Sequence, residues 1–433
     1  MSLAADDHRY IWHPFTQQQG WAEEEPVIIE SADGTTLTDT EGRRYIDGVS
    51  SLWCNVHGHR HPKIDAAVQE QLGKVAHSTM LGLSHRPAIE LARRLVKLGP
   101  RGLSRVFFSD SGSTATEIAL KMAFQFWAQN RDGTARAKFI TLKDAYHGDT
   151  LGSVSAGGID LFHETYRPLL FDTLKAEPGD IADMEWLLAQ NEGRVAAVMM
   201  EPLVQGAAGM LMHPPGYLGA VRRLCDRYGV LLICDEVATG FGRTGTMFAC
   251  EQEEVAPDLM CVAKGITGGY LPLAATFTTE RIYEGFLGRH DEYRTFFHGH
   301  TYTGNPLACA AAIATLAVFD EERTLECLQA KIDLLTRLLE PIARLGCVGE
   351  VRQRGFMVGI ELEGYDPALR MGHEVTLEAR ARGAIIRPLG DVIVLMPPLS
   401  IEGAELQRLV AITRQAIEAA TSKAQSDTLP LAA

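Results

Sequence analysis

The sequence predicts an α/β protein with a large domain built around a mostly parallel sheet and a smaller α+β domain. Between about residues 60 and 300, short apolar runs alternate with helix-like segments. Runs of this length, flanked by polar or turn residues, are typical of strands buried on both faces. Strands separated by helices indicate βαβ units and a parallel sheet. The predicted strands are 106–108, 139–142, 195–200, 230–234, 259–263 and 273–277.

Composition supports a large folded core and excludes several classes of function. The chain has 433 residues, 46% of them hydrophobic and 22% charged. Lys and Arg number 41 against 55 Asp and Glu, which gives a net charge of −14 and argues against nucleic-acid or anionic-membrane binding. No apolar run reaches the roughly 18 residues of a membrane span, and the N-terminus does not resemble a secretory signal. We therefore expect a cytoplasmic protein whose eight cysteines, none in a CxxC pair, are buried and reduced.

The order of the predicted elements suggests three segments. Residues 1–55, with strand-like stretches at 36–40 and 43–46, form the N-terminal segment of the small domain. Residues 56–305 form the large domain, and residues 306–433 form the C-terminal part of the small domain. Within this last segment we expect a long helix after Pro306, a charged helix at 322–345, strands at 357–362 and 392–396, and a final amphipathic helix at 402–421.

The first chemical motif is SDSGSTATEIALK at 109–121, where a strand ends and a helix begins. Gly112 allows close approach of the backbone to a ligand. Ser113 and Thr114 place hydroxyl groups beside the free N–H groups of the helix N-terminus. The motif therefore predicts a phosphate or anion cradle. The alternative is an ordinary helix capped by Ser or Thr.

The second and third motifs lie at the ends of two predicted strands. LLICDE at 231–236 delivers Asp235 to the carboxyl edge of the sheet, where α/β proteins bind ligands. Glu236 should face the opposite side, so a paired-carboxylate mechanism is geometrically awkward. Lys264 ends the run at 259–263, and poor solvation there lowers a lysine pKa and suits Schiff-base chemistry. The alternatives are a capping Asp and a Lys that reaches the surface.

Together, the three motifs are more specific than any one of them. A phosphate cradle, a strand-end carboxylate and a strand-end lysine on one parallel sheet are what pyridoxal 5'-phosphate requires. The cradle would hold the phosphate, the carboxylate would keep the ring nitrogen protonated, and the lysine would condense with the aldehyde.

Nearly the whole chain resembles the class III aminotransferases of the fold type I pyridoxal-phosphate transferases. The resemblance rests on DEVATGFGRTG at 235–245, on a lysine 264 − 235 = 29 residues after the aspartate, on the 109–121 motif, on YHG at 146–148 and on HGHTYTGNPLA at 298–308. It implies a homodimer with the site between subunits. It also implies a Schiff-base role for Lys264, pairing of Asp235 with the ring nitrogen, and cofactor contacts by Gly112, Ser113, Tyr146, Gln205 and, from the neighbouring subunit, Thr301.

Within that family the sequence is most similar to the branch that aminates 8-amino-7-oxononanoate to 7,8-diaminononanoate in biotin biosynthesis. The matching pieces are WHPFT at 12–16, VQGAAGM at 204–210 and RPLG at 387–390. This similarity implies that the small-molecule substrate is bound by Trp53, Tyr146, Gly299 and Arg387. A guanidinium group can bind a substrate carboxylate through two hydrogen bonds. The alternative for Arg387 is a surface or ion-paired arginine.

The amino donor is left open between S-adenosylmethionine and lysine. Members of this branch that use S-adenosylmethionine usually read HPY and SWW, whereas this chain has Phe15 and Leu52 at those positions. A tyrosine hydroxyl and one indole are therefore missing from the donor side of the pocket. The sequence around these positions is more similar to that of the lysine-using forms.

Three other functions are compatible with parts of the sequence. One is an omega-amino acid or diamine transaminase that uses pyruvate or 2-oxoglutarate. Another is a non-catalytic protein that binds the same cofactor, although Lys264 and Asp235 both argue against it. A zinc hydrolase would use His57, His59 and His61, but Gly58 and Pro62 favour a loop there and no HExxH helix accompanies them. We therefore predict no metal.

Overall fold

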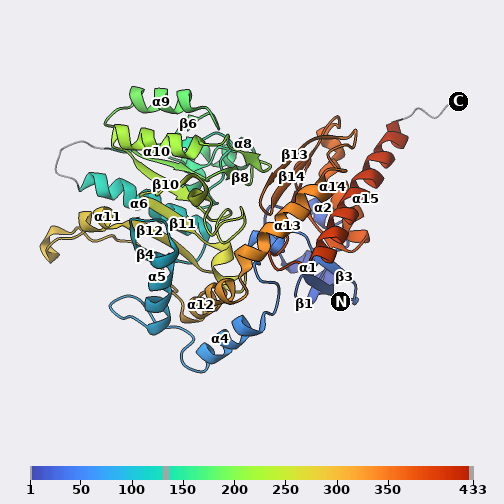
Figure 1. Cartoon of the computed structure of the whole chain (residues 1–433), viewed down its shortest axis with the longest axis horizontal. Helices are drawn as coiled ribbons and strands as arrows, with labels where there is room; N and C mark the ends of the chain where they lie inside the picture. Colours follow the sequence, from blue (N-terminus) through green and yellow to red (C-terminus); the bar gives the residue numbers. More distant parts are fainter. Residues whose placement is uncertain (1, 130–135, 429–433) are drawn as a thin grey trace.

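The computed structural model describes residues 2–129 and 136–428, which form two packed domains (Figure 1). A seven-stranded sheet forms the centre of the large domain. Of its neighbouring pairs, β12 runs antiparallel to β4 and β11, and the other pairs are parallel. This confirms the predicted mixed, mostly parallel sheet. In spatial order the strands are β4 (Leu103–Ser109), β12 (Ala274–Thr279), β11 (Leu259–Val262), β10 (Leu231–Asp235), β7 (Val195–Met200), β5 (Lys138–Leu142) and β6 (Leu174–Ala176).

Helices cover both faces of this sheet, which is why its central strands are apolar throughout. All residues of β7 and β10 are buried. Alternate residues of each strand enter two separate cores: Ile233 packs with α6 (Gly112–Ala128), whereas Leu232 packs with α10 (Tyr217–Tyr228) and α5 (Arg86–Leu98). A strand buried on both sides cannot alternate apolar and polar residues, and this accounts for the continuous runs in the sequence.

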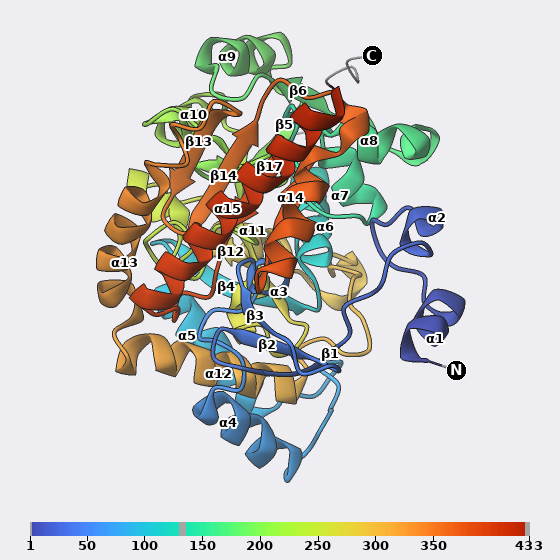
Figure 2. The same cartoon turned by 90° about the vertical axis from the view of Figure 1, so that its right-hand side faces the viewer.

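The small domain combines the two ends of the chain. One sheet joins β1 (Ile29–Asp33), β2 (Thr36–Asp39) and β3 (Arg44–Asp47) to β15 (Ala384–Ile385). A second sheet has the order β13-β14-β17-β16, and α14 and the long α15 cross it in Figure 2. Its elements are β13 (Val348–Arg354), β14 (Met357–Leu362), β16 (Arg387–Leu389), β17 (Val392–Leu395), α13 (Thr324–Leu339), α14 (Met371–Ala381) and α15 (Gly403–Thr428).

Helix α12 (Pro306–Glu321) connects the two domains. It packs against α4 (Pro62–Leu72), α5 and the turn at Lys264–Thr267. Its buried face is rich in alanine, including Ala308, Ala311 and Ala312, which lets the helices approach closely. By these contacts α12 belongs with the large domain, although the order of the predicted elements placed it at the start of the C-terminal segment.

The remaining elements are short and mostly lie in connections. Two of them, β8 and β9, form a small hairpin beside the sheet. The sequence did not predict β1, β6, β8, β9, β13, β15 or β16. Most of them have two to five residues and carry little periodicity, and the longer β13 is mostly polar. The elements not yet placed are α1 (Leu3–Tyr10), α2 (Gln18–Trp21), α3 (Ser50–Trp53), α7 (Leu151–Ala156), α8 (Asp160–His163), α9 (Ile181–Gln190), α11 (Glu280–Gly285), β8 (Val204–Gln205) and β9 (Leu211–Met212).

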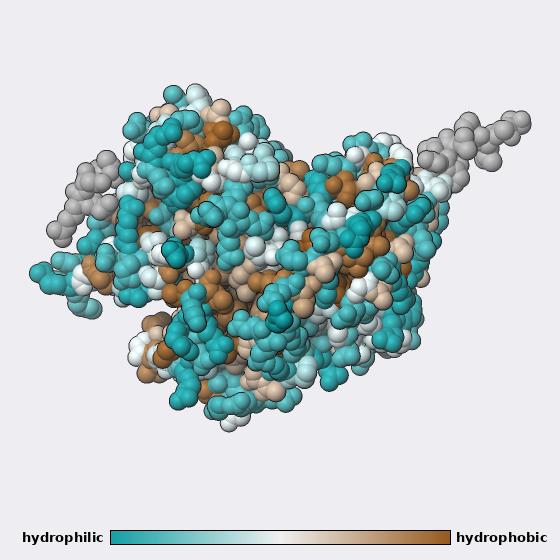
Figure 3. All heavy atoms as spheres, in the orientation of Figure 1, coloured by the Kyte–Doolittle hydropathy of each residue, from teal (hydrophilic) through white to brown (hydrophobic). Residues whose placement is uncertain are grey.

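The surface agrees with the acidic, polar composition. The face seen in Figure 3 is mostly hydrophilic, with apolar patches scattered over it. Within residues 2–129 and 136–428, no helix is long and apolar enough to cross a membrane. All eight cysteines are free; five are buried, Cys54 and Cys347 are half-buried, and Cys327 is exposed.

Candidate active site

A cavity of about 820 Å³ opens at the carboxyl ends of β7, β10 and β11, at the N-terminus of α6. Asp235 and Lys264 come from the strand ends, Gly112 and Ser113 from the helix, and Tyr146 from the loop after β5. The small-domain residue Trp53 contributes a further wall. The structure therefore brings together six of the residues singled out from the sequence.

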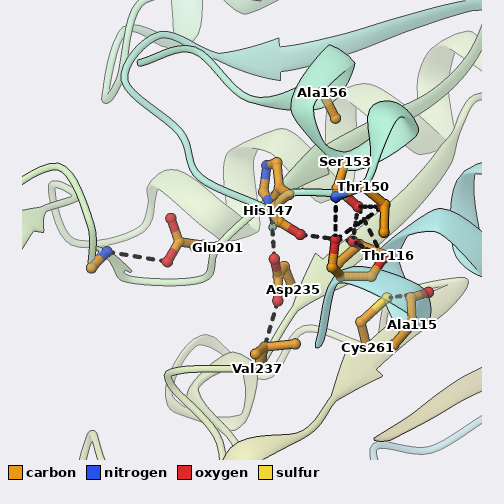
Figure 4. A network of polar contacts seen from close by, with 12 residues as sticks. Ala115, Thr116, His147, Thr150, Ser153, Ala156, Glu201, Asp235, Val237 and Cys261 are labelled. Atoms are coloured by element: carbon orange, nitrogen blue, oxygen red, sulfur yellow. Dashed lines mark hydrogen bonds and ion pairs between the residues drawn. The ribbon is translucent and has the colours of Figure 1, made fainter. Parts of the chain in front are cut away.

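Asp235 is a buried carboxylate held by two hydrogen bonds. His147 Nδ1 donates to Asp235 Oδ2 at 2.7 Å, and the backbone N–H of Val237 donates to Oδ1 at 3.0 Å (Figure 4). Asp235 is 3% exposed and lines the cavity. The two hydrogen bonds fix the orientation of its carboxylate. A positively charged ring nitrogen is the kind of partner such a carboxylate stabilises.

Glu236 faces the other side of β10, as the strand geometry predicts. Its carboxylate accepts hydrogen bonds from Thr239 Oγ1 at 2.5 Å and from the backbone N–H groups of Ala249 and Cys250 at 3.0 and 2.8 Å. It does not line the cavity. Glu236 thus fastens the loop after β10, and Asp235 alone of this pair serves the site.

Lys264 follows β11 in a strained conformation. Its φ is +46°, a left-handed geometry that costs a non-glycine residue about 1–3 kcal/mol and often marks functional sites. Burial lowers the pKa of its amine, while the nearby Asp235 and Glu201 act in the opposite direction. The amine lies 4.9 Å from the centre of the Trp53 ring. A lysine with a lowered pKa is suited to act as a nucleophile and as a proton carrier.

The predicted phosphate cradle lies at the N-terminus of α6, in the wall of the cavity. Ser111 caps α6, so the amides of Gly112 and Ser113 are the first of the helix and have no intrahelical acceptor. Ser113 Oγ bonds the hydroxyl and the amide of Thr150, both at 2.9 Å. A Cβ at Gly112 would lie 2.6 Å from Val237 Cγ1, so only glycine fits. Free amides, hydroxyl groups and the helix dipole together favour an anion.

Tyr146 remains a neutral phenol in the cavity wall. Its hydroxyl donates to Asp149 Oδ2 at 2.7 Å, and burial, reinforced by the Asp149 carboxylate, raises its pKa. The phenol also acts electrostatically on Arg387, whose pKa burial lowers. Tyr146 thus lines the large cavity and also influences the pKa of Arg387, which lines a neighbouring cavity.

Arg387 lines a second, smaller cavity of about 350 Å³, together with Phe15 and Arg380. It is half-buried, and among the described residues its guanidinium group has no hydrogen-bond or ion-pair partner. The structure therefore does not support the alternative that Arg387 is ion-paired. A half-buried, unpaired guanidinium is suited to bind a carboxylate from a ligand.

A strained turn separates the two cavities. Ser50, Ser51 and Trp53 all have positive φ, between +52° and +62°. The buried carboxylate of Asp47 stabilises the turn, because it accepts hydrogen bonds from the Val49 and Ser51 amides and from His59. Ser51 faces the smaller cavity, and Trp53 faces the larger one. Leu52, half exposed at 51%, also lines the larger cavity.

Three expected site residues lie outside both cavities. Gln205 is fully buried, and its Nε2 donates to the Lys143 carbonyl at 2.8 Å. Gln205 is not among the residues that line the cavity, and its buried Oε1 has no hydrogen-bond partner among the described residues. The expected contact with the ring stays a prediction. Gly299 and Thr301 lie on the exposed segment after α11.

The three histidines considered as zinc ligands have three different partners. His57 bonds the Thr315 carbonyl, His59 bonds Asp47, and His61 bonds Glu322. No group of three or more potential ligands converges among the described residues.

Two residues of the site were not assigned from the sequence. His147 belongs to the YHG motif but received no role, and it positions Asp235. Glu201 is 4% exposed and lines the cavity, and burial together with the charge of Asp235 raises its pKa to about 8. The available signal was its place directly after the apolar run at 195–200, at the same sheet edge as Asp235.

These groups fit pyridoxal 5'-phosphate. The helix N-terminus would hold the phosphate, Asp235 the ring nitrogen and Lys264 the aldehyde carbon. Two buried polar atoms beside Asp235, Glu201 Oε2 and His147 Nε2, have no partner among the described residues, which is typical of a site that a polar ligand completes.

Comparison with known proteins decides the family. The profile of the class-III aminotransferases matches residues 18–417. The chain belongs to the class-III aminotransferase family. It is thus a pyridoxal-phosphate-dependent aminotransferase, with the fold expected from the resemblance.

Individual class-III aminotransferases are similar over nearly the whole chain. The adenosylmethionine-8-amino-7-oxononanoate aminotransferase of Nitratidesulfovibrio vulgaris is 57% identical, over 97% of this chain and 82% of its own. The crystal structure of the enzyme of that name from Methanocaldococcus jannaschii superposes with a TM-score of 0.94 at 44% identity, covering 96% and 98% of the two chains. The omega transaminase of Pseudomonas jessenii, in complex with PMP, has a TM-score of 0.93 at 28% identity, covering 98% and 99%.

Proposed function

We propose that this aminotransferase transfers an amino group from S-adenosylmethionine or lysine to 8-amino-7-oxononanoate, giving 7,8-diaminononanoate for biotin biosynthesis. The name and 57% identity of the relative from Nitratidesulfovibrio vulgaris support the substrate assignment. The observation that carries the proposal is the unpaired Arg387 beside a cavity that already holds Asp235 and Lys264.

Each residue around the cofactor has a separate role in amino transfer. When bound, pyridoxal phosphate supplies the carbonyl that takes up the amino group and the ring that delocalises electrons. Asp235, fixed by His147, holds a proton on the ring nitrogen. Lys264 would bind the aldehyde carbon and, when its amine is free, would serve as the base that takes a proton from the donor carbon and delivers it to the cofactor. Burial lowers the pKa of this amine, which favours the form that can accept a proton.

Arg387 positions the substrates by their carboxylates. The acceptor ends in a carboxylate, and both candidate donors carry one beside their amino group. Since the donor and the acceptor use the cavity in turn, one arginine can serve both half-reactions. Tyr146 and Trp53 would line the path between that carboxylate and the reacting carbon.

We also propose that the active unit is a homodimer. Gly299 and Thr301 are exposed and lie outside the cavity of their own chain. The family resemblance assigns Thr301 to the phosphate site of the neighbouring subunit, which accounts for its place outside the cavity of its own chain. Gly299, two residues before Thr301, is implied to contact the substrate. Eight free cysteines are compatible with a reducing cytoplasm, where we place the enzyme.

The amino donor can be tested by single half-reactions. The purified protein is loaded with pyridoxal phosphate, and S-adenosylmethionine and L-lysine are added in separate cuvettes. We expect one of the two donors to abolish the visible absorbance of the cofactor that is linked to Lys264. Loss with S-adenosylmethionine alone would mean that Phe15 and Leu52 are tolerated in the usual donor pocket. Loss with lysine alone would mean that these residues mark a different donor pocket.

The acceptor separates this proposal from an omega transaminase. The amino-loaded enzyme is mixed with 8-amino-7-oxononanoate, pyruvate or 2-oxoglutarate, and recovery of the visible absorbance is followed. We expect recovery with 8-amino-7-oxononanoate. Recovery with pyruvate or 2-oxoglutarate and none with 8-amino-7-oxononanoate would contradict the proposal.

A further inference from the structure

We propose that Glu201 is a further residue of the cofactor site: an uncharged carboxylic acid that donates a hydrogen bond to the 3'-oxygen of bound pyridoxal phosphate. The inference rests on cofactor binding in the large cavity. It does not depend on which donor or acceptor the enzyme uses.

Glu201 has an unused hydrogen-bonding group at the cavity. It follows β7, is 4% exposed and lines the cavity wall. Its Oε1 accepts a hydrogen bond from the Gly206 amide at 3.1 Å. Among the described residues no group donates to the buried Oε2. Buried polar atoms in proteins are usually paired, so an unpaired carboxyl oxygen in a cavity wall indicates a site that a polar ligand completes.

The surroundings of Glu201 favour its neutral form. Burial disfavours the charged carboxylate, and the neighbouring Asp235, which is held by two hydrogen-bond donors, repels a second negative charge. The amides of Gly206 and Tyr146 and the amine of Lys264 act in the opposite direction, but the pKa is still raised to about 8. Near neutral pH the acid therefore carries a proton that it can donate.

The position of Glu201 relative to the other anchors assigns the oxygen that it would meet. In the pyridoxal ring, the 3'-oxygen and the phosphate-bearing substituent lie on opposite edges, with the ring nitrogen and the aldehyde carbon between them. Figure 4 shows Glu201 on one side of Asp235 and the first turn of α6, with Ala115 and Thr116, on the other. A ring held by Asp235 at its nitrogen and by α6 at its phosphate therefore turns its 3'-oxygen toward Glu201.

Trp53 and Gly206 keep Glu201 in this position. A Cβ at Gly206 would lie 3.3 Å from the Trp53 ring and 3.5 Å from Glu201 Oε1. A side chain at Gly206 would therefore crowd both the indole and the acid, so glycine suits the position whose amide binds Glu201. Gln205, for which the family resemblance implies a cofactor contact, lies on the same segment, and its Nε2 donates to the Lys143 carbonyl.

The test is a pH titration of the visible absorbance of the cofactor-loaded protein, without substrate. This absorbance reports the proton on the linkage between Lys264 and the cofactor. A donor to the 3'-oxygen stabilises its anion and weakens its hold on that proton, so the donor lowers the pKa of the linkage. Loss of the donor in Glu201→Ala should raise this pKa by about one pH unit. Glu201→Gln, which keeps an N–H donor and adds no charge, should stay close to the wild type.

The direction of the change in the pKa of the linkage distinguishes the proposal from its alternatives. If Glu201 is an anion, removing its charge in either variant lowers the pKa of the linkage, and the proposal is wrong. If Glu201 does not contact the cofactor, Glu201→Ala leaves the titration unchanged, and the proposal is equally wrong. Glu236→Gln is the matched control, because Glu236 is also buried but faces away from the cavity; it should not move the titration.

Infrared spectroscopy keeps the test decisive if Glu201→Ala does not fold. Removing the cofactor from the wild type should shift a carbonyl stretch of a protonated carboxylic acid. This band should be missing in Glu201→Gln. A wild type without such a band would overturn the proposal, whatever the substrates of the enzyme are.

Discussion

The two neighbouring cavities differ in how their polar groups are prepared. In the larger cavity, hydrogen bonds within the protein already orient the side chains of the site: His147 fixes Asp235, and Thr150 fixes Ser113. In the smaller cavity, Arg387 has no partner among the described residues, and Phe15 is 62% exposed. Both cavities share the turn around Ser51 and Trp53.

This difference matches the two kinds of ligand. A cofactor that stays bound through both half-reactions benefits from groups fixed in advance, because no reorganisation is needed at the moment of reaction. Two substrates of different shape that exchange in one place need an anchor with room around it. Hence we expect substitutions in the large cavity to affect the chemical step, and substitutions in the small cavity to affect substrate binding.

The largest effect is expected from Lys264→Ala. Without the amine there is neither a covalent anchor nor a proton carrier, so turnover should fall by roughly four orders of magnitude or more. Turnover and the visible absorbance of the loaded protein are the two measurements. Lys143→Ala, at an exposed lysine paired with Glu177, should keep both. Turnover by the Lys264 variant near the wild-type level would contradict the assignment.

The next largest effect is expected from Asp235→Asn. The amide cannot keep the ring nitrogen charged, so the maximal rate should fall by roughly 100- to 1,000-fold while cofactor still binds. Stopped-flow absorbance of a single half-reaction measures this rate, and the absorbance of the loaded protein checks occupancy. A rate within a few-fold of the wild type would exclude Asp235 as the partner of the ring nitrogen.

Arg387→Ala should act on binding of the amino acceptor. Loss of a charged hydrogen-bonded contact of about 1.5–3 kcal/mol should weaken acceptor binding, so steady-state kinetics should show KM raised by roughly 10- to 100-fold, with a smaller change in kcat. Arg380→Ala, at another arginine of the same cavity, is the control and should change KM much less. An unchanged KM in the Arg387 variant would move the carboxylate contact to another residue.

The smallest effect is expected from the double change Phe15→Tyr and Leu52→Trp. It restores the hydroxyl and the indole that S-adenosylmethionine-using relatives usually carry. We expect the ratio of kcat/KM for S-adenosylmethionine to that for lysine to rise by roughly threefold to tenfold, the equivalent of about 1 kcal/mol. Steady-state kinetics with each donor measure the ratio. A ratio that stays constant or falls would show that these positions do not determine the donor.

Whether the sequence predicted a strand depended mainly on the length of its apolar run. The six long apolar runs predicted six strands of the central sheet, because burial on both faces leaves a clear signal. The strands β6, β8, β9, β15 and β16 were missed, because two or three residues form no period. The longer β13 was missed because most of its residues are polar. Similarly, Asp235 and Lys264 were predicted because each ends a long run, whereas the role of His147 depends on a loop that folds back onto Asp235.

Gln205 and Glu201 show the same limit within one segment. The resemblance pointed to EPLVQG as a whole, and within it to the amide of Gln205. In the structure, the short strand β8 directs Gln205 toward the Lys143 carbonyl, while Glu201 remains at the edge of the sheet. Which side chain of a segment faces a cavity depends on backbone turns that local composition does not encode.

The sequence by itself determined the sheet, the cofactor chemistry and the residues that end its central strands, because these follow from apolar runs and from the residues directly after them. Only the tertiary structure decided which polar groups meet. The contact of His147 with Asp235 joins residues that are 88 positions apart in the chain, on a loop and at a strand end of the large domain. The approach of Trp53, from the small domain, to the amine of Lys264 depends on how the two domains pack. No local pattern in the chain specifies either contact.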